Sequence, residues 1–260
     1  MGRQYKYARN EGRAMKALVF AAGLGTRLRP ITDHMPKALV PVAGVPMLER
    51  VILKLASQGC DSFVVNVHHF ASMIEDFLAD KANFGLPIAI SEELAEPLET
   101  GGGIKHAAPL LTSPEGRFLV HNADILSTLD VGWFIGHDCP GTLATLLVRD
   151  APADRCLLFD DDMRLTGWTN VKTGEVKSPY LPDYDPSAYH KLSFCGIHIV
   201  SEDVFPAMAS WPEKFSIIDF YLSMAALRPI KGVIAPADMR LVDIGSPDGL
   251  KEAEDLAARF

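Results

Sequence analysis

The sequence predicts an α/β protein, a Rossmann-like three-layer α/β/α domain built on a central mixed, mostly parallel sheet. Three observations carry this prediction. From Met15 onward, short β-branched runs alternate with segments of helical period, as in repeated β-α units. A glycine-bearing loop follows the first predicted strand directly, and an aspartate follows a later one. No run of residues approaches the ~20 continuous apolar positions of a membrane span.

In the first half, apolar runs and the Pro and Gly residues that flank them predict the strands and helices. Residues 16–21 read as a buried strand that runs into the loop 22–27. Pro46 opens a helix with one apolar face, and Gly59 ends it. The remaining pattern predicts, in order, strand 62–67, helix 71–80, strand 87–90 and strand 117–121.

The second half is less regular. It predicts strands at 142–148 and 193–200 and helices at 217–227 and 246–259. Between them, Asp150 to His190 is rich in Pro, Asp, Gly and Thr, and we interpret it as an excursion that covers one side of the cleft. We therefore expect a single domain over 15–260, in two functional halves, 15–125 and 126–260. Residues 1–14 are expected to be a disordered tail or a non-native start ahead of Met15.

Composition limits the class of partner. A net charge of −8 and a pI near 5.5 argue against a nucleic-acid surface, so we expect neither nucleic-acid nor membrane binding. The four cysteines form no Cys-x-x-Cys pair, which favours reduced thiols in a cytoplasmic protein over a zinc site or disulfides. Lys and Arg in a local cleft can still bind anionic substrates. A homo-oligomer is left open.

The clearest motif follows the first strand: Ala22-Gly23-Leu24-Gly25-Thr26-Arg27, continuing to Pro36-Lys37. Small residues after a buried strand let backbone N–H groups approach a polyphosphate closely. Arg27 and Lys37 add positive charge at the two ends of the loop. The Walker loop is absent, and Leu28 stands where a dinucleotide fingerprint needs a third glycine.

This motif, Gly-x-Gly-Thr-Arg-Leu-Arg-Pro with a trailing Pro-Lys, resembles the signature of the sugar-phosphate nucleotidyltransferases. The resemblance implies a nucleotidyltransferase fold, with 15–125 as the nucleotide-binding half and 126–260 as the sugar-phosphate half. It implies that residues 22–27 clasp a nucleoside triphosphate. Arg27 would contact the leaving pyrophosphate, and Lys37 the α-phosphate and the incoming sugar 1-phosphate.

A second segment, Glu96-Pro97-Leu98-Glu99-Thr100-Gly101-Gly102-Gly103, places three glycines at a helix entry. Bare backbone at Gly101 and Gly102 would admit a nucleotide, and the preceding acidic residues, Glu96 among them, could accept hydrogen bonds from a base or hydroxyl. Within the family, this segment most resembles the enzymes that uridylylate N-acetylmuramate 1-phosphate in cell-wall (peptidoglycan) recycling. A helix entry without a ligand is the alternative.

Two aspartates distant in sequence, Asp124 and Asp243, each follow a predicted strand. Magnesium prefers one or two carboxylates together with phosphate oxygens and water. The resemblance therefore implies a Mg²⁺ site at Asp124 and Asp243, with Arg27, Lys37 and Asp124 as the catalytic residues. It assigns the sugar phosphate to Lys37, Asn122, Gly196 and Asp243, although Gly196 could instead be a packing glycine.

The predicted reaction is an in-line attack of a sugar-phosphate oxygen on the α-phosphorus, without a covalent enzyme intermediate. The sequence departs from the family at Ala123, at Arg155-Cys156 and at Leu165 to Asn170, where a sugar-gripping Glu-Lys-Pro is absent. UTP with N-acetylmuramate 1-phosphate is the first expectation. Mannose 1-phosphate guanylyltransfer, another sugar or phosphocholine, and a non-catalytic nucleotide-sugar sensor remain alternatives.

Overall fold

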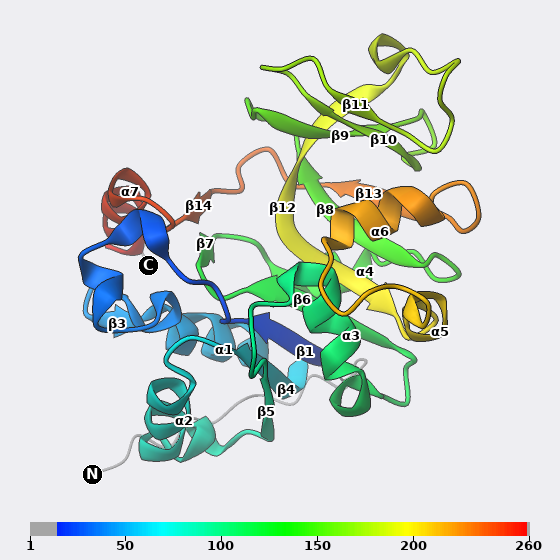
Figure 1. The fold of residues 1–260 in the computed structure, drawn as a ribbon. Helices are drawn as coiled ribbons and strands as arrows, with labels where there is room; N and C mark the ends of the chain where they lie inside the picture. The colour runs from blue at the N-terminus through cyan, green and yellow to red at the C-terminus, as the bar shows by residue number, and fades with distance from the viewer. Residues whose placement is uncertain (1–14, 259–260) are drawn as a thin grey trace.

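The structure is a computed structural model that describes residues 15–258. The tail predicted for residues 1–14 therefore lies outside the described residues. Figure 1 shows a central sheet with helices against both faces. The predicted α/β class and the mixed, mostly parallel central sheet are confirmed. The helices are α1 (Met47–Ser57), α2 (Ala71–Asp80), α3 (Glu99–Leu111), α4 (Val131–Gly136), α5 (Val204–Met208), α6 (Ile217–Met224) and α7 (Pro247–Ala257).

Ten of the strands join in one sheet, in the order β11-β10-β9-β12-β6-β1-β4-β5, with β8 also beside β12 and β13 beside β8. Two further pairs, β14-β7 and β2-β3, lie outside it. The strands are β1 (Met15–Phe20), β2 (Pro41–Val42), β3 (Val45–Pro46), β4 (Cys60–Val67), β5 (Ile88–Glu92), β6 (Arg117–Asn122), β7 (Ile125–Ser127), β8 (Ala144–Arg149), β9 (Arg155–Phe159), β10 (Leu165–Asn170), β11 (Val176–Lys177), β12 (His190–Ser201), β13 (Ile230–Ile234) and β14 (Leu241–Asp243).

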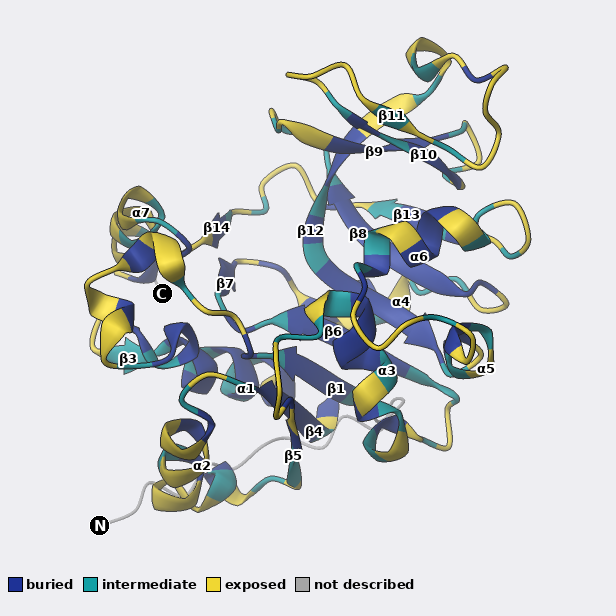
Figure 2. Ribbon diagram, in the orientation of Figure 1, coloured by how far each residue is buried: buried dark blue, intermediate teal, exposed yellow. Residues whose placement is uncertain are grey.

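The first half is the parallel part of the sheet. Strands β6, β1, β4 and β5 run parallel, and the run of apolar residues in β1 fits burial on both faces. Ala17 and Val19 belong to the core under α1 and α2, whereas Leu18 faces the core under α3, α5 and α6. This alternation makes the third layer, because successive side chains of a strand point to opposite faces. Figure 2 shows these central strands as buried.

Strand β12 links the two parts of the sheet. It pairs antiparallel with β6 and β8 over its second half and with β9 near its start. The register with β8 shifts between Phe194 and His198, around Gly196, whose φ is +69°. The strand therefore bends where it passes the end of β6, and it carries β9, β10 and β11 away from the parallel core (Figure 1).

Strands β9, β10 and β11 were not predicted. They lie in the Pro- and Asp-rich segment 150–190, where the runs of alternating apolar and polar residues are too short to stand out. Leu157 and Leu158 of β9 are buried, and β9 pairs with β10 in antiparallel register. The segment thus extends the same sheet as an excursion. Strand β13 was also missed, and it pairs parallel with β8.

Candidate active site

The phosphate-loop candidate, residues 22–27, joins β1 to a short 3-10 helix at Thr26–Leu28. Gly25 has φ +63°, and its carbonyl accepts a 2.8 Å hydrogen bond from Thr32 Oγ1. A Cβ at position 25 would lie 2.8 Å from Thr32 Cγ2, so glycine is required both by the backbone angle and by the close approach. Gly23, Leu24, Thr26 and Arg27 are exposed, which leaves this loop open to a ligand.

Lys37 begins a second 3-10 turn, Lys37–Leu39, and its side chain is only 10% exposed. Its ammonium group donates to Asp124 Oδ2 and, at 3.2 Å, to Asp243 Oδ1. A nearly buried ammonium ion is tolerated here because two carboxylates pair with it. The structure therefore brings together three of the predicted site residues.

The two aspartates meet through a small antiparallel sheet. Strand β7 follows Asp124 and pairs with β14, so that Asp243 lies opposite Ile125. The N–H of Ile244 donates to the Asp124 carbonyl at 3.0 Å, and that of Gly245 donates to Asp243 Oδ1 at 2.6 Å. Backbone pairing thus fixes the distance between two carboxylates that are far apart in the chain.

Arg27 completes a group that we call the charged cluster: Arg27, Lys37, Asp124 and Asp243. A guanidinium nitrogen of Arg27 lies 3.9 Å from Asp243 Oδ2, and the Arg27 side chain is 70% exposed. Arg27 is therefore an exposed cation at the rim, in contrast to the enclosed Lys37. No group of three or more His, Cys, Asp or Glu within residues 15–258 is arranged to hold a metal ion.

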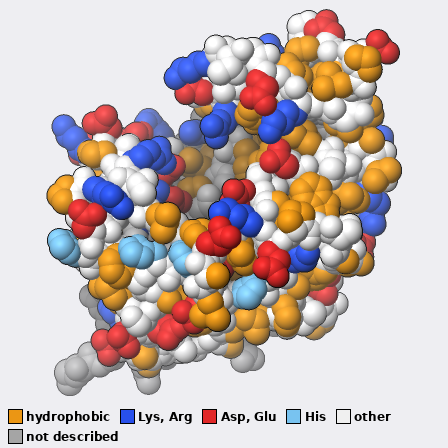
Figure 3. Space-filling model, viewed as in Figure 1, with side chains coloured by type: hydrophobic (Ala, Val, Ile, Leu, Met, Phe, Trp, Pro, Cys, Tyr) orange, Lys and Arg blue, Asp and Glu red, His pale blue; other side chains and the backbone are white. Residues whose placement is uncertain are grey.

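Two cavities adjoin this cluster. The smaller, of about 220 Å³, is lined by Ala22, Gly23 and Asp124 and by the segment before α3. The larger, of about 820 Å³, lies between the parallel strands and the β9-β10-β11 excursion and includes Asp243 in its wall. Phe20, Glu99, Thr100 and Asn122 line both, so the cavities are neighbours. Figure 3 shows this face hollowed, with charged side chains around the hollow.

Asn122 and Gly196 lie in contact at the boundary of the larger cavity. A Cβ on Gly196 would be 2.8 Å from Asn122 Nδ2 and 2.6 Å from Ile125 Cδ1. Glycine is therefore needed both for its positive φ and for packing against β6. Both residues also line the larger cavity, and their contact with a sugar phosphate stays a prediction.

Gly101, Gly102 and Glu96 lie differently from the prediction. The N–H groups of Gly101 and Gly102 donate to the Phe215 carbonyl, and a Cβ on Gly102 would lie 2.0 Å from the Glu213 carbonyl oxygen. Their bare backbone is thus covered by the segment before α6 and does not line either cavity. Glu96 pairs with Lys214 of the same segment. A direct nucleotide contact at these residues stays a prediction.

Glu93 is a residue that sequence reasoning missed. Only 3% exposed, it accepts hydrogen bonds of 2.8 Å from Asn66 Nδ2 and from the Leu98 N–H. It therefore ties the loop before α3 to β4, and it lines the smaller cavity together with Asn66. An adjacent pair of glutamates after a predicted strand gives no sign of such burial.

Four side chains of the larger cavity were likewise not predicted: Arg149, Arg155, Lys177 and His198. Burial lowers the pKa of His198 to about 3, and a 2.8 Å hydrogen bond joins its Nδ1 to the Tyr221 hydroxyl. His198 is therefore neutral, and the positive charge of this wall comes from Arg149, Arg155 and Lys177. Trp168 of β10 also lines the cavity.

No helix within residues 15–258 is long and apolar enough to cross a bilayer. Residues 16–137 match the model of the nucleotidyl transferase family. The chain is 33% identical over 243 residues to N-acetylmuramate α-1-phosphate uridylyltransferase of Caulobacter vibrioides, which covers 92% of this chain and 95% of that protein. The protein of the same name from Neisseria meningitidis is 44% identical over 116 residues, 45% of this chain and 49% of its own.

Solved structures share the fold. The inositol-1-phosphate CTP transferase of T. maritima superposes with a TM-score of 0.75 at 18% identity, over 95% of this chain and 96% of its own. That identity supports the fold alone, whereas the similarity to the Caulobacter protein runs through nearly the whole chain. The chain therefore belongs to the sugar-phosphate nucleotidyltransferase family and is a nucleotidyltransferase that acts on sugar 1-phosphates.

Proposed function

We propose that this enzyme transfers a uridylyl group from UTP to N-acetylmuramate 1-phosphate with Mg²⁺, releasing pyrophosphate, as a cytoplasmic step of cell-wall sugar recycling. The observation that carries the substrate assignment is the end-to-end similarity to a uridylyltransferase of that name. The charged cluster between two neighbouring cavities supports the chemistry. Such a junction is where two polyanionic substrates would meet.

The cavities suggest how the substrates divide the site. The nucleotide lies in the smaller cavity, with its phosphates along residues 22–27, and the acceptor lies in the larger cavity over Gly196. Arg27, at the exposed rim, binds the departing pyrophosphate. Lys37 neutralises charge on the α-phosphate and the acceptor phosphate, which would otherwise repel each other.

Asp124 and Asp243 fit a Mg²⁺ ion by the chemistry of their donors. Each offers carboxylate oxygens, and Mg²⁺ commonly takes one or two carboxylates with substrate oxygens and water. Lys37 and Gly245 donate to Asp124 Oδ2 and Asp243 Oδ1. Asp124 Oδ1 and Asp243 Oδ2 would therefore face a metal, with the exposed Arg27 guanidinium group 3.9 Å from Asp243 Oδ2. When bound, the metal neutralises negative charge on the phosphates. The residues align two phosphates, and no nucleophilic side chain is required.

The test is pyrophosphate release with Mg²⁺ from UTP, GTP, CTP and dTTP, each paired with the 1-phosphates of N-acetylmuramate, N-acetylglucosamine, glucose and mannose and with phosphocholine. We expect release with UTP and N-acetylmuramate 1-phosphate, slowed by about 100-fold in Asp124→Asn and kept in Asp162→Asn, a change at an exposed turn. Release with GTP and mannose 1-phosphate would make the chain a guanylyltransferase. Silence from folded protein in every combination would favour a non-catalytic sensor.

A further inference from the structure

The larger cavity, which we call the acceptor cavity, has three cationic side chains in its wall, beside four carboxylates that belong to Glu99, Glu175, Asp219 and Asp243. The three cations are Arg149 at the end of β8, Arg155 at the start of β9 and Lys177 at the end of β11. All three belong to the part of the sheet opposite the nucleotide loop. The question is which of them is available to a ligand.

Two of the three cations have partners within the protein. Lys177 Nζ lies 3.2 Å from Asp219 Oδ1 and 5.3 Å from the centre of the Trp168 ring, so its charge is already paired. Arg149 donates to the Leu241 carbonyl at 3.4 Å. That contact holds Arg149 beside β14, near Asp243, at the phosphate end of the cavity.

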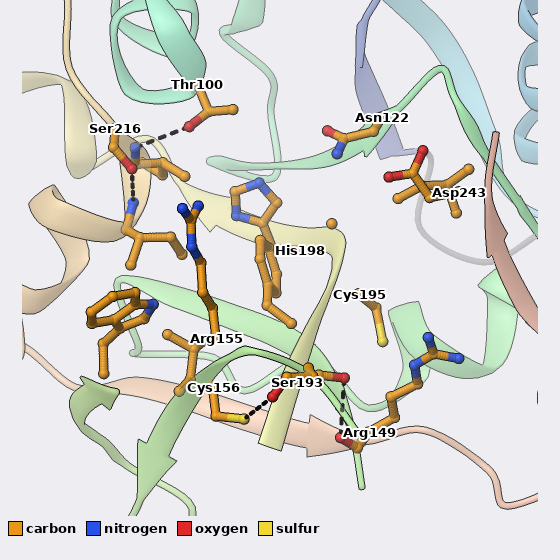
Figure 4. A pocket seen from close by; sticks show the side chains of 18 of the residues that line it. Thr100, Asn122, Arg149, Arg155, Cys156, Ser193, Cys195, His198, Ser216 and Asp243 are labelled. Carbon is orange, nitrogen blue, oxygen red and sulfur yellow. Dashed lines mark hydrogen bonds between the residues drawn. The ribbon is translucent and has the colours of Figure 1, made fainter. Parts of the chain in front are cut away.

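Arg155 has no such partner. Among residues 15–258, no carboxylate forms a salt bridge with its guanidinium group, although Glu99 and Glu175 line the same cavity. Figure 4 shows its side chain extending from β9 into the cavity, toward Thr100 and Ser216 and away from Asp243. A guanidinium group stays charged at any physiological pH and matches a carboxylate with two parallel hydrogen bonds.

We propose that Arg155 determines acceptor specificity by binding a carboxylate on the sugar, at the end of the acceptor cavity remote from the transferred phosphate. This inference rests on the proposed function, because N-acetylmuramate differs from N-acetylglucosamine by a lactyl ether that carries a carboxylate. The acceptor then has two anionic groups, one at the charged cluster and one at Arg155. A neutral sugar 1-phosphate leaves Arg155 unpaired and gains no contact there.

The experiment crosses two enzymes with two acceptors. Wild type and Arg155→Gln are each assayed for kcat/KM with N-acetylmuramate 1-phosphate and with its lactyl amide, which has the same shape without the charge. We expect the amide to lower the wild-type kcat/KM by about 10-fold or more, mainly through KM, and to change that of Arg155→Gln by less than about 2-fold. Arg155→Lys keeps the charge but cannot form the two parallel hydrogen bonds of a guanidinium group. We expect its loss of kcat/KM with the amide to lie between those of wild type and Arg155→Gln.

Arg164→Gln is the matched control, since Arg164 is an exposed arginine of the same excursion that does not line the cavity. It is expected to behave as wild type with both acceptors. Equal penalties for the amide in wild type and Arg155→Gln would overturn the role of Arg155 while leaving the proposed function intact. A wild type that uses another acceptor in place of N-acetylmuramate 1-phosphate would overturn the proposed function, and this inference with it.

Discussion

Lys37 Nζ lies 3.2 Å from Asp243 Oδ1, although the two residues are 206 positions apart in the chain, and the same ammonium group is bonded to Asp124. This contact joins the loop after β1 to the strand before α7. It means that the cation proposed for the phosphates and the carboxylates proposed for the metal hold one another in place before any ligand binds. Several consequences can be measured.

The first prediction concerns Lys37→Met. We expect kcat to fall by about 100-fold or more, because the cation that faces the reacting phosphates is lost. We also expect the free enzyme to bind Mg²⁺ more tightly, since Asp124 and Asp243 lose the ammonium group that neutralises them. Steady-state kinetics and Mg²⁺ titration calorimetry provide the two readouts. A variant with unchanged or weaker Mg²⁺ affinity would argue against a metal at this carboxylate pair.

The second prediction concerns Asp124→Asn. The change keeps the shape but removes the charge that pairs with Lys37, which is only 10% exposed. We expect kcat to fall by about 100-fold and the Mg²⁺ concentration for half-maximal rate to rise. Activity assayed across a Mg²⁺ series measures both. If Asp124→Asn had full activity at the Mg²⁺ concentrations that saturate the wild type, Asp124 would not be a metal ligand.

The third prediction separates strain from contact at Gly196. Gly196→Ala places a Cβ at φ +69°, 2.6 Å from Ile125 Cδ1 and 2.8 Å from Asn122 Nδ2. Gly174→Ala, at φ +74° in open space, carries the same backbone cost without the contact. We expect Gly174→Ala to lower the free energy of unfolding by about 1 kcal/mol. For Gly196→Ala we expect about 2–4 kcal/mol.

Urea denaturation measures the two free energies, and kinetics should show a raised acceptor KM for Gly196→Ala alone. Equal destabilisation by the two substitutions would mean that β12 relaxes away from β6 at no cost. The packing explanation for Gly196 would then be wrong.

The fourth prediction concerns pH and two buried histidines on adjacent strands, His121 of β6 and His198 of β12. Burial lowers the pKa of His121 to about 4 and that of His198 to about 3, below the ordinary value of 6.5. As pH falls below 6.5, the two histidines therefore become protonated in the unfolded chain but stay neutral in the folded protein. Stability is thus fully present above pH 6.5 and decreases toward pH 4, by up to about 1.4 kcal/mol per pH unit for each histidine.

The measurement compares the free energy of unfolding at pH 7 and pH 5 in wild type and in His198→Gln. We expect the variant to lose less stability over this interval, because one histidine no longer resists protonation. His69→Gln, at an exposed position, should keep the wild-type difference. An unchanged pH dependence in His198→Gln would show that His198 is not held neutral in the folded protein.

Much of the nucleotide half is predictable because its signals are local. Periodicity locates α2 at the observed Ala71–Asp80, and the run before the glycine loop locates β1 to within one residue at each end. In the loop 22–27, the glycines that would let backbone N–H groups approach phosphate and the cation Arg27 stand within six residues of one another. Such features depend on neighbouring residues, which the sequence displays.

The three glycines in the first turn of α3 show the limit of local reasoning. A Gly-Gly-Gly entry suggests backbone left open to a ligand, but here Glu213 to Phe215 cover it. The reason for the glycines lies in a segment more than a hundred residues away in the chain, which packs in the same core as α3. No reading of residues 96–103 alone could distinguish a ligand from that packing.

The sequence by itself determined the α/β class, because the alternation of strand and helix patterns is local. It also predicted the phosphate loop and the site residues Arg27, Lys37, Asp124 and Asp243, from the loop motif, from the strands before the aspartates and from the family resemblance. Only the tertiary structure decided that these four form one cluster, since the β7-β14 pairing brings the aspartates together. It alone extended the sheet through β9, β10 and β11 and placed Arg155 in the acceptor cavity. Contacts between distant segments depend on packing, which the local sequence does not encode. Short irregular strands have too little hydrophobic periodicity to be predicted from the sequence.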